Sequence, residues 1–384
     1  MRPDLLIFGG GIAGLWTLLR VRQAGYHALL LENRALGGVQ SIASQGIIHG
    51  GTKYALGGSV TESTRAIGDM PGIWRDALAG RGDIDLSGVR LLSGHQYLWS
   101  SGSLASSLAS LFASKLMCSR VAPLARDELP PPFDVSGFRG RLYRLQEPVL
   151  DTASLMKRLA TQARPWCCLY DSESMEVRDN TVVIGNLEIS PRRVLLAAGG
   201  GNAALMARWG MTAPSMQLRP LHMVMARGKL PPVHAHCLGA SSNPRLTITS
   251  YPLESGDSVW YLGGQLAETG VAREPAAQIS EARAELEKLL PWMDFDLLDW
   301  ATLPVDRAEV ATPGGKRPDD CYLGGAGSVM VAWPTKLAFA PRLADRVLER
   351  LAREGIEPSE QDMPPPDLPA PPLAPLPWEH ASWS

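Results

Sequence analysis

A glycine-rich turn near the N-terminus constrains the fold of this chain more than any other feature. Residues 9–14 read Gly-Gly-Gly-Ile-Ala-Gly and directly follow an apolar run at residues 5–8. Apolar residues at helical spacing then continue to Val21, and a second apolar run from residue 28 ends at Glu32. This order predicts a strand, a tight turn, a helix and a second buried strand, which together form a βαβ unit.

The spacing Gly9-x-Gly11-x-x-Gly14 in this context predicts a dinucleotide-binding site. Gly9 allows the tight turn, Gly11 lets the backbone approach a pyrophosphate, and Gly14 allows the helix to pack closely on the strand. Glu32, at the end of the second strand, would accept hydrogen bonds from an adenosine ribose. The alternative is a purely structural glycine turn. The same fingerprint serves both NAD and FAD, so the turn alone does not choose between them.

The charge balance and the cysteines exclude several other functions. The chain has 37 Lys and Arg against 39 Asp and Glu, so it lacks a basic field that would hold a nucleic acid. None of its five cysteines forms a Cys-x-x-Cys pair, and the adjacent Cys167 and Cys168 are expected to be buried apolar residues. No signal-peptide pattern and no apolar run of membrane-spanning length is visible. We therefore expect a cytoplasmic protein without a transmembrane segment, with contact to a membrane surface left open.

The remaining patterns predict two kinds of sheet. Helical periodicity is found at residues 152–163, 278–290 and 343–351. Short apolar runs that predict strands are found at residues 182–184, 187–189 and 194–198. Between residues 217 and 266, alternating segments are separated by clusters of Gly, Pro, Ser and Asn, which predicts an antiparallel sheet.

Two further segments have an open interpretation. Residues 103–117 have an apolar pattern at helical spacing, which predicts a helix packed on the core, with a lid or a membrane-dipping helix as the alternative. After Pro358 the sequence is rich in proline, which favours neither a helix nor a sheet. We expect residues 356–384 to form an extended or disordered tail.

A second glycine cluster resembles another dinucleotide fingerprint. Residues 199–204 read Gly-Gly-Gly-Asn-Ala-Ala and fit the pattern G-x-G-x-x-A. Only a short helix fits between this cluster and Gly210, and the following strand has no acidic end. The spacing therefore disfavours a second site. Arg227 could serve a 2′-phosphate instead, so an FAD/NAD(P)H reductase stays an alternative.

The segment after the βαβ unit favours FAD. Residues 41–54 offer hydroxyls, an amide and backbone N–H groups just beyond the phosphate site, as a flavin ring and its ribityl chain require. Within it, Ile48-His49-Gly50-Gly51-Thr52-Lys53-Tyr54 resembles the D-amino-acid oxidase / glycerol-3-phosphate dehydrogenase family of FAD enzymes, and the glycerol-3-phosphate dehydrogenase branch especially. Further matches, at residues 149–152, 194–200 and 333–338, extend the resemblance over residues 4–352.

The resemblance implies a fold of class α/β, α+β overall, in which a Rossmann-like FAD-binding domain carries a mixed, largely antiparallel substrate domain. The implied FAD-binding domain comprises residues 1–80, 145–215 and 305–355, and the substrate domain residues 81–144 and 216–304. The implied cofactor-binding residues are Gly9, Gly11, Ile12, Ala13, Gly14, Glu32, Asn33, Ser41, Ser44, Gln45, Gly46, Ile48, His49, Ala198, Gly199, Gly200, Thr335, Lys336 and Leu337.

The resemblance also implies a reaction. A hydride would pass to flavin N5 from a CH–OH or CH–NH carbon of a small anionic substrate, which is a 2-hydroxy acid, a polyol phosphate or an amino acid. The sequence does not choose between oxygen and a quinone as the final electron acceptor. A rival from another class is a non-catalytic assembly protein that keeps FAD as a structural ligand and docks partners through the proline-rich tail.

Four residues are candidates for the chemistry. His222, on a predicted strand, would be the base, and its alternative is an ordinary packed or surface histidine. His49 would line the flavin or be attached to it covalently. Arg307 would hold the substrate anion through its planar fork, with a surface ion pair as the bland alternative and Arg219 as the next candidate. Lys336 would stabilise charge on the reduced flavin.

Overall fold

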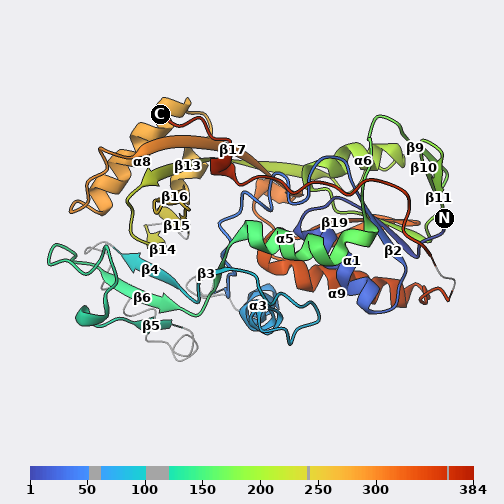
Figure 1. Cartoon of the computed structure of the whole chain (residues 1–384), viewed down its shortest axis with the longest axis horizontal. Coiled ribbons are helices and arrows are strands. Elements are labelled where there is room, and N and C mark those ends of the chain that lie inside the picture. Colours follow the sequence, from blue (N-terminus) through green and yellow to red (C-terminus); the bar gives the residue numbers. More distant parts are fainter. Residues whose placement is uncertain (52–61, 101–120, 240–242, 361–362) are drawn as a thin grey trace.

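The computed structural model describes residues 1–51, 62–100, 121–239, 243–360 and 363–384, with two large sheets side by side (Figure 1). The predicted helix at residues 103–117 and the family-like residues Thr52, Lys53 and Tyr54 lie outside this part of the chain.

The first sheet has six strands in the order β18-β19-β12-β1-β2-β8. Its strands are β1 Leu5–Phe8, β2 Ala28–Glu32, β8 Cys167–Leu169, β12 Arg193–Leu196, β18 Tyr322–Ala326 and β19 Val329–Trp333. All neighbours are parallel except β18 and β19. Every residue of β1 is buried, because layers cover both faces of the sheet. This explains why its sequence is a continuous apolar run.

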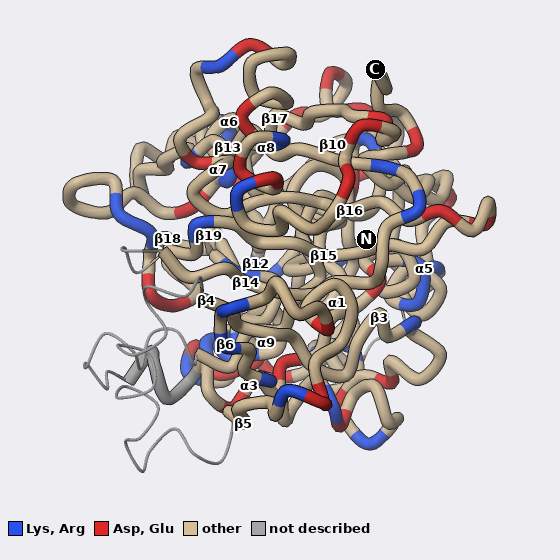
Figure 2. Tube along the Cα trace, turned by 90° about the vertical axis from the view of Figure 1, so that its left-hand side faces the viewer, with Lys and Arg blue, Asp and Glu red and all other residues tan. Residues whose placement is uncertain are grey.

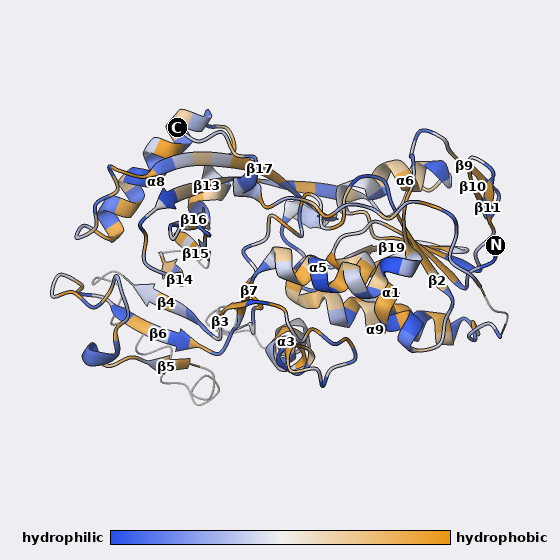
Figure 3. Ribbon diagram, viewed as in Figure 1, coloured by the Kyte–Doolittle hydropathy of each residue, from blue (hydrophilic) through white to orange (hydrophobic). Residues whose placement is uncertain are grey.

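Helices cover one face of this sheet, and a short helix and a small sheet cover the other. The helices on the first face are α1 Ile12–Gln23, α5 Thr152–Ala163 and α9 Ala340–Arg353, with α3 Glu62–Leu78 beside them. On the second face lie α6 Asn202–Arg208 and the strands β9 Met175–Arg178, β10 Thr181–Ile184 and β11 Leu187–Ile189. Alternate residues of β1 serve the two cores, Leu5 and Ile7 the first, Leu6 and Phe8 the second. The strand β2 is accordingly coloured largely as apolar in Figure 3, whereas the helices carry both apolar and hydrophilic residues.

The second sheet has eight strands in the order β17-β13-β16-β15-β14-β4-β6-β5. Its strands are β4 Gln96–Ser100, β5 Val121–Pro123, β6 Arg141–Leu145, β13 Met216–Gly228, β14 His234–Leu238, β15 Leu246–Pro252, β16 Ser258–Gly263 and β17 Asp299–Val310. Only the pair β14 and β4 is parallel. The predicted Rossmann-like unit and the largely antiparallel sheet are therefore both confirmed.

Two long strands connect the halves of the molecule. β13 and β17 pair over their whole length, from Met216 opposite Val310 to Arg227 opposite Asp299. The helices α7 Gln265–Thr269 and α8 Pro275–Leu289 pack against this sheet, α8 on an apolar core that includes Val224 and Ala226. A two-stranded pair, β3 Leu91–Ser93 and β7 Val149–Leu150, lies between the halves. The domain boundaries stay a prediction, and β17 crosses the one between residues 304 and 305.

Several sequence predictions for single elements are confirmed, with shifts at their ends. The helix predicted at residues 152–163 is α5, which Asp151 caps by accepting hydrogen bonds from the N–H groups of Ala153 and Ser154. The helix predicted from residue 278 begins three residues earlier because Pro275 is favoured in a first helical turn. Cys167 and Cys168 are buried in β8 with free thiols, and burial raises the pKa of Cys168 to about 11.

The proline-rich tail is extended, which was one of the two predictions for it. It packs against other segments of the same chain. We call residues 363–384 the C-terminal strap. At one end, Leu36 and Leu169 donate backbone hydrogen bonds to Pro372 and Pro369 at 2.8 and 2.7 Å. At the other end, Ser384 and Trp300 exchange two backbone hydrogen bonds. The strap therefore runs from the edge of the first sheet to the far end of the second (Figure 1).

Charges of both signs are interspersed along the trace (Figure 2). Among the described residues, no helix combines the length and the apolar character needed to cross a bilayer.

The contact between the strap and the second sheet yields a stability prediction. Trp378 is 7% exposed, and its ring lies 4.3 Å from the ring of Tyr251. Replacing Trp378 with Ala should lower the free energy of unfolding by about 3 kcal/mol, because the substitution removes a buried aromatic side chain. Chemical denaturation of the flavin-loaded protein measures this change. Trp383→Ala is the control. That ring stacks on Arg227 at 4.2 Å and stays partly exposed, so its loss should cost about 1 kcal/mol or less.

Candidate functional site

The glycine turn is as tight as its sequence predicts. Gly9 has a φ of +107°, and a Cβ placed there would lie 2.5 Å from the Cα of Ala198. A Cβ on Gly14 would lie 1.9 Å from the carbonyl oxygen of Gly9. Neither position therefore accepts a side chain, and β1, the end of β12 and the start of α1 meet at this turn.

Polar groups around the turn suit a dinucleotide. The Ser41 hydroxyl accepts a hydrogen bond from the Ile12 N–H, in the first turn of α1, at 2.9 Å. The Glu32 carboxylate, at the end of β2, accepts from the Gly10 N–H at 2.6 Å and from the Arg34 N–H at 2.8 Å. A helix N-terminus beside backbone N–H groups favours a pyrophosphate, and an acidic group at the end of the second strand favours a ribose. These residues therefore fit the cofactor that the sequence predicts.

A pocket of about 1220 Å³ extends from the turn to the second sheet. Most of the predicted cofactor residues line it: Gly9, Gly11, Ile12, Ala13, Glu32, Asn33, Ser41, Ser44, Gln45, Gly46, His49, Ala198, Gly199, Gly200, Thr335, Lys336 and Leu337. Two others do not line it. Gly14 packs against Gly9. Ile48 is fully buried in the core between the first sheet and its helices, whereas its neighbours Ile47 and His49 line the pocket.

The loop after β2 is tied to the second sheet. Gln45 donates to the Tyr261 carbonyl at 2.8 Å and accepts from the Thr247 hydroxyl at 2.8 Å. Gln40 donates to the carbonyl of Asp306 on β17 at 3.2 Å. The cofactor side and the sheet side of the pocket are therefore joined directly by side chains.

Guanidinium groups gather where β13 and β17 line the pocket. Arg219 and Arg307 are paired across these strands, and the Arg307 Nε–H donates to the Arg219 carbonyl at 3.1 Å. The Nη2 of Arg307 lies 3.6 Å from a carboxylate oxygen of Glu268, and that of Arg219 lies 3.7 Å from the same oxygen. Burial, with repulsion from Arg219 and Arg317, lowers the pKa of Arg307 to about 10. Three guanidinium groups, of Arg219, Arg307 and Arg317, thus face two carboxylates, of Glu268 and of Glu309, which lies 3.2 Å from Arg219. An anionic ligand would balance the additional positive charge.

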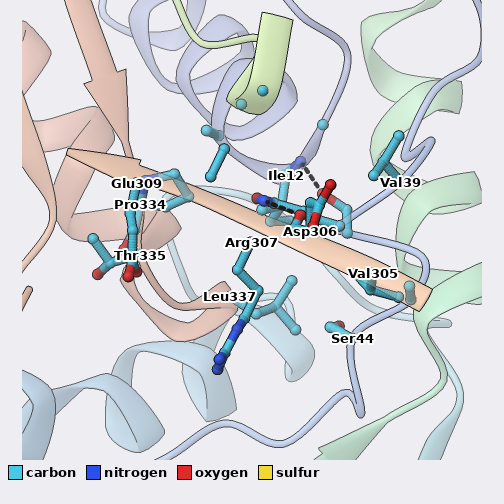
Figure 4. A pocket seen from close by; sticks show the side chains of 18 of the residues that line it. Ile12, Val39, Ser44, Val305, Asp306, Arg307, Glu309, Pro334, Thr335 and Leu337 are labelled. Atoms are coloured by element: carbon cyan, nitrogen blue, oxygen red, sulfur yellow. Dashed lines mark hydrogen bonds between the residues drawn. The ribbon is translucent and has the colours of Figure 1, made fainter. Parts of the chain in front are cut away.

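Figure 4 shows β17 crossing the pocket with Asp306 and Arg307 on it. In this view Ile12 and Val39 lie on one side of the strand, and Ser44 and Leu337 on the other. Both groups of residues line the same pocket. The Arg307 side chain lines this pocket and is 26% exposed, and its role in binding an anion stays a prediction.

Lys336 lines the pocket from the segment that follows β19. Its ammonium donates to the Asp319 carbonyl at 3.3 Å and lies 4.8 Å from the centre of the Phe339 ring. The side chain is mostly buried. Lys336 therefore supplies a cation to the wall of the pocket, beside Pro334, Thr335 and Leu337, which line it too.

His49 occupies the pocket wall in a group of three ionisable side chains. Its Nδ1 lies 3.4 Å from a carboxylate oxygen of Glu147, and its ring centre lies 5.5 Å from that of His236 on β14. His49 and His236 both line the pocket. Glu147 is buried behind them.

His222 lies on the wrong face of its strand for the predicted role, and this prediction needs correction. Leu221 and Met223, its neighbours on β13, line the pocket, so His222 points to the opposite face. There its Nδ1 lies 3.0 Å from the Gly270 carbonyl, and its own carbonyl accepts a hydrogen bond from Gln278. His222 is therefore a packed, buried histidine, which was the alternative interpretation of this residue.

The second glycine cluster does not form a second dinucleotide unit. Gly199–Gly201 form a 3-10 turn, and α6 leads into β13 of the other sheet rather than into a neighbouring parallel strand. Arg227 is paired with Asp299 at 2.6 Å and is absent from the residues that line the pocket. The reductase alternative therefore has no support among the described residues.

Four pocket residues lie outside the sequence prediction. Arg317, Glu268 and His236 line the pocket, and Glu147 supports its wall. Arg317 follows Gly314 and Gly315 in the segment after β17. Strand register and loop pairing bring the other three to the site.

Comparison with known proteins agrees with this geometry. A family model described as FAD dependent oxidoreductase matches residues 4–331. A probable FAD-dependent oxidoreductase of Pseudomonas aeruginosa is 53% identical over 388 residues, with 99% of this chain and 98% of the relative covered. Its crystal structure superimposes with a TM-score of 0.86 at 47% identity and covers 99% and 98% of the two chains.

More distant solved structures share the fold. Glycine oxidase from Geobacillus kaustophilus has a TM-score of 0.68 at 16% identity, with 94% of this chain and 100% of that chain covered. FAD-bound L-alpha-glycerophosphate oxidase from Mycoplasma pneumoniae has a TM-score of 0.64 at 13% identity, with 92% and 95% covered.

The close approach at Gly9 yields a prediction on cofactor binding. Gly9→Ala should give protein with little or no bound flavin, because the new Cβ would collide with the backbone at Ala198. Flavin absorbance per mole of purified protein measures the effect. Gly210→Ala is the matched control, since Gly210 also has a positive φ, +64°, but has open space around it. It should keep its flavin, and equal flavin content in both variants would contradict the prediction.

Proposed function

Because this chain belongs to the D-amino-acid oxidase family of FAD-dependent oxidoreductases, we propose that it oxidises a CH–OH or CH–NH carbon of a small anionic substrate. The bound FAD supplies the two-electron acceptor, which takes a hydride at flavin N5. The protein's own task is to hold the substrate anion, to take the O–H or N–H proton and to exclude water.

The paired arginines carry this proposal. Arg307 and Arg219, which are paired across β17 and β13, line the same pocket as the glycine turn. A guanidinium binds a carboxylate or phosphate through two parallel hydrogen bonds. Glu268, shared between them at 3.6 and 3.7 Å, reduces their mutual repulsion until the substrate binds.

Two further residues complete the proposed site. His49 takes the place of His222 as the proton acceptor, because it lines the pocket and His222 does not. Lys336, which lines the same pocket, supplies a positive charge for the flavin, on which negative charge develops when it is reduced. In this arrangement no covalent link between His49 and the flavin is needed.

The substrate class is a 2-hydroxy acid, a polyol phosphate or an amino acid. All three carry an anionic group that the arginines can hold and a neighbouring C–H bond to be oxidised. The names of two solved neighbours, a glycine oxidase and a glycerophosphate oxidase, support testing both amino acids and polyol phosphates. The rival assembly function is less well supported, since the C-terminal strap makes its backbone and Trp378 contacts with its own chain.

Anaerobic reduction of the bound flavin tests the proposal. The purified yellow protein is mixed, without oxygen, with 2-hydroxy acids, glycerol 3-phosphate, amino acids and N-substituted glycines in turn. At least one should bleach the visible flavin absorbance, and air or a soluble quinone should then restore it. Dithionite serves as the control that the flavin is reducible. Bleaching by NAD(P)H alone, or by no member of the panel, would contradict the proposed function.

Replacement of Arg307 tests its role in holding the anion. Arg307→Ala should lower kcat/KM for the best substrate about a hundredfold, or about 2–4 kcal/mol, because a charge-assisted bidentate contact is lost. Arg307→Lys should recover only part of this loss. Flavin content should stay near that of the wild type in both variants. Arg227→Ala, an arginine on β13 outside the pocket, is the control and should leave kcat/KM unchanged. Full activity of Arg307→Ala would remove Arg307 from the site.

A further inference from the structure

The backbone around His49 is fixed by a neighbouring segment of the chain. The Ile48 N–H donates to the Pro148 carbonyl at 2.9 Å, and the Leu150 N–H donates to the Gly46 carbonyl at 2.9 Å. Ile47 and Val149 form an antiparallel bridge between these hydrogen bonds. Residues 46–50 are therefore paired with residues 147–150, and this pairing brings Glu147 opposite His49 and Gly50.

The Glu147 side chain is built into this pairing. One carboxylate oxygen accepts from the Gly50 N–H at 2.7 Å, and the other accepts from Gln96 on β4 and lies 3.4 Å from the Nδ1 of His49. The residue is 4% exposed. Burial alone would raise the pKa of the Glu147 carboxyl, but its interactions with His49, Gly50 and Gln96 hold that pKa below its ordinary value. A buried carboxylate that stays ionised is costly, and it is tolerated here because each oxygen has a donor.

From this geometry we propose that Glu147 is a positioning residue for the oxidation: it fixes the ring orientation and tautomer of His49, so that Nε2 takes the substrate's O–H or N–H proton. The inference rests on the proposed function. As the substrate's C–H hydride and its electron pair leave for the flavin, its O–H or N–H proton passes to His49 Nε2 and a C=O or C=N bond forms. Glu147 remains ionised and stabilises the imidazolium, as a carboxylate does behind a histidine base.

The ring of His236 lies beside the ring of His49. The two ring planes are inclined by 46° with centres 5.5 Å apart, and the neighbours of His236 on β14, Ala235 and Cys237, are in the core beneath α8. Strand alternation therefore commits His236 to the pocket face. With Glu147 at Nδ1 and His236 against the ring, His49 is restrained at the pocket wall.

A double-mutant cycle tests whether Glu147 acts through His49. Glu147→Gln keeps the shape of the side chain but removes its charge. It should lower the limiting rate of anaerobic flavin reduction by the best substrate about 10- to 100-fold, with the substrate Kd little changed. His49→Asn should lower the rate at least as much. The double variant should match His49→Asn alone, since a positioning residue has no effect once its partner is gone.

The control uses another buried carboxylate from the same stretch of chain. Asp151 is 3% exposed and pairs with Arg90 instead of a pocket residue. Asp151→Asn should leave the limiting rate unchanged, because Asn also caps a helix. Multiplicative rate losses in the Glu147→Gln, His49→Asn double variant would assign Glu147 a merely structural role and overturn the proposal, as would an unchanged rate in Glu147→Gln.

A spectroscopic readout keeps the inference separate from the choice of substrate and from the folding of any variant. In the wild-type holoenzyme labelled with ¹⁵N-histidine, His49 should be present as the Nδ1–H tautomer when neutral. Glu147→Gln should lose this preference. An Nε2–H tautomer in the wild type overturns the inference directly. If the tautomer is as expected but no panel compound reduces the flavin, the proposed oxidation fails while the His49–Glu147 pairing stands.

Discussion

The contact between Gly14 and the carbonyl of Gly9 is the constraint on which the rest of the site depends. The helix can start directly at the end of β1 only because no side chain separates them. That close start brings the N-terminus of α1 to the wall of the pocket, beside the ends of β2 and β12. The carboxyl ends of parallel strands meet at one edge of a sheet, so residues that are far apart in the sequence lie together beside this turn.

The second half of the site depends on the register of two strands. β13 and β17 pair so that Arg219 lies opposite Arg307. Two like charges directly opposite each other are unfavourable in an ordinary sheet. Here Glu268 and Glu309 offset part of that repulsion, while burial, followed by repulsion from Arg219 and Arg317, lowers the pKa of Arg307. An anion bound between the two arginines would offset their repulsion in the same way as these carboxylates do.

Local patterns in the sequence predicted the first part of this arrangement well. The βαβ unit, Glu32 at the end of its strand, and the buried cysteines follow from apolar periodicity and glycine chemistry, which act over a few residues. His222 shows where such reasoning fails. Alternation along a strand predicts that neighbours point to opposite faces, but which face meets the pocket depends on α7 and α8, which come later in the chain. Glu147 was beyond reach for a similar reason, because it meets His49 through a pairing between segments about a hundred residues apart.

The C-terminal strap has a consequence for how a substrate reaches the pocket. Its hydrogen bonds fasten one end to Leu36, beside the glycine turn's sheet, and its last residue to Trp300, at the far end of β17. The strap therefore links the two halves of the molecule in addition to β13 and β17, and hydrogen bonds hold its far end. Contacts at a second, separate place oppose the relative movement of the two halves that β13 and β17 already connect. Moving the two sheets apart would break the hydrogen bonds of the strap and the contact of Trp378 with Tyr251, so the strap opposes this motion as a route for substrate entry.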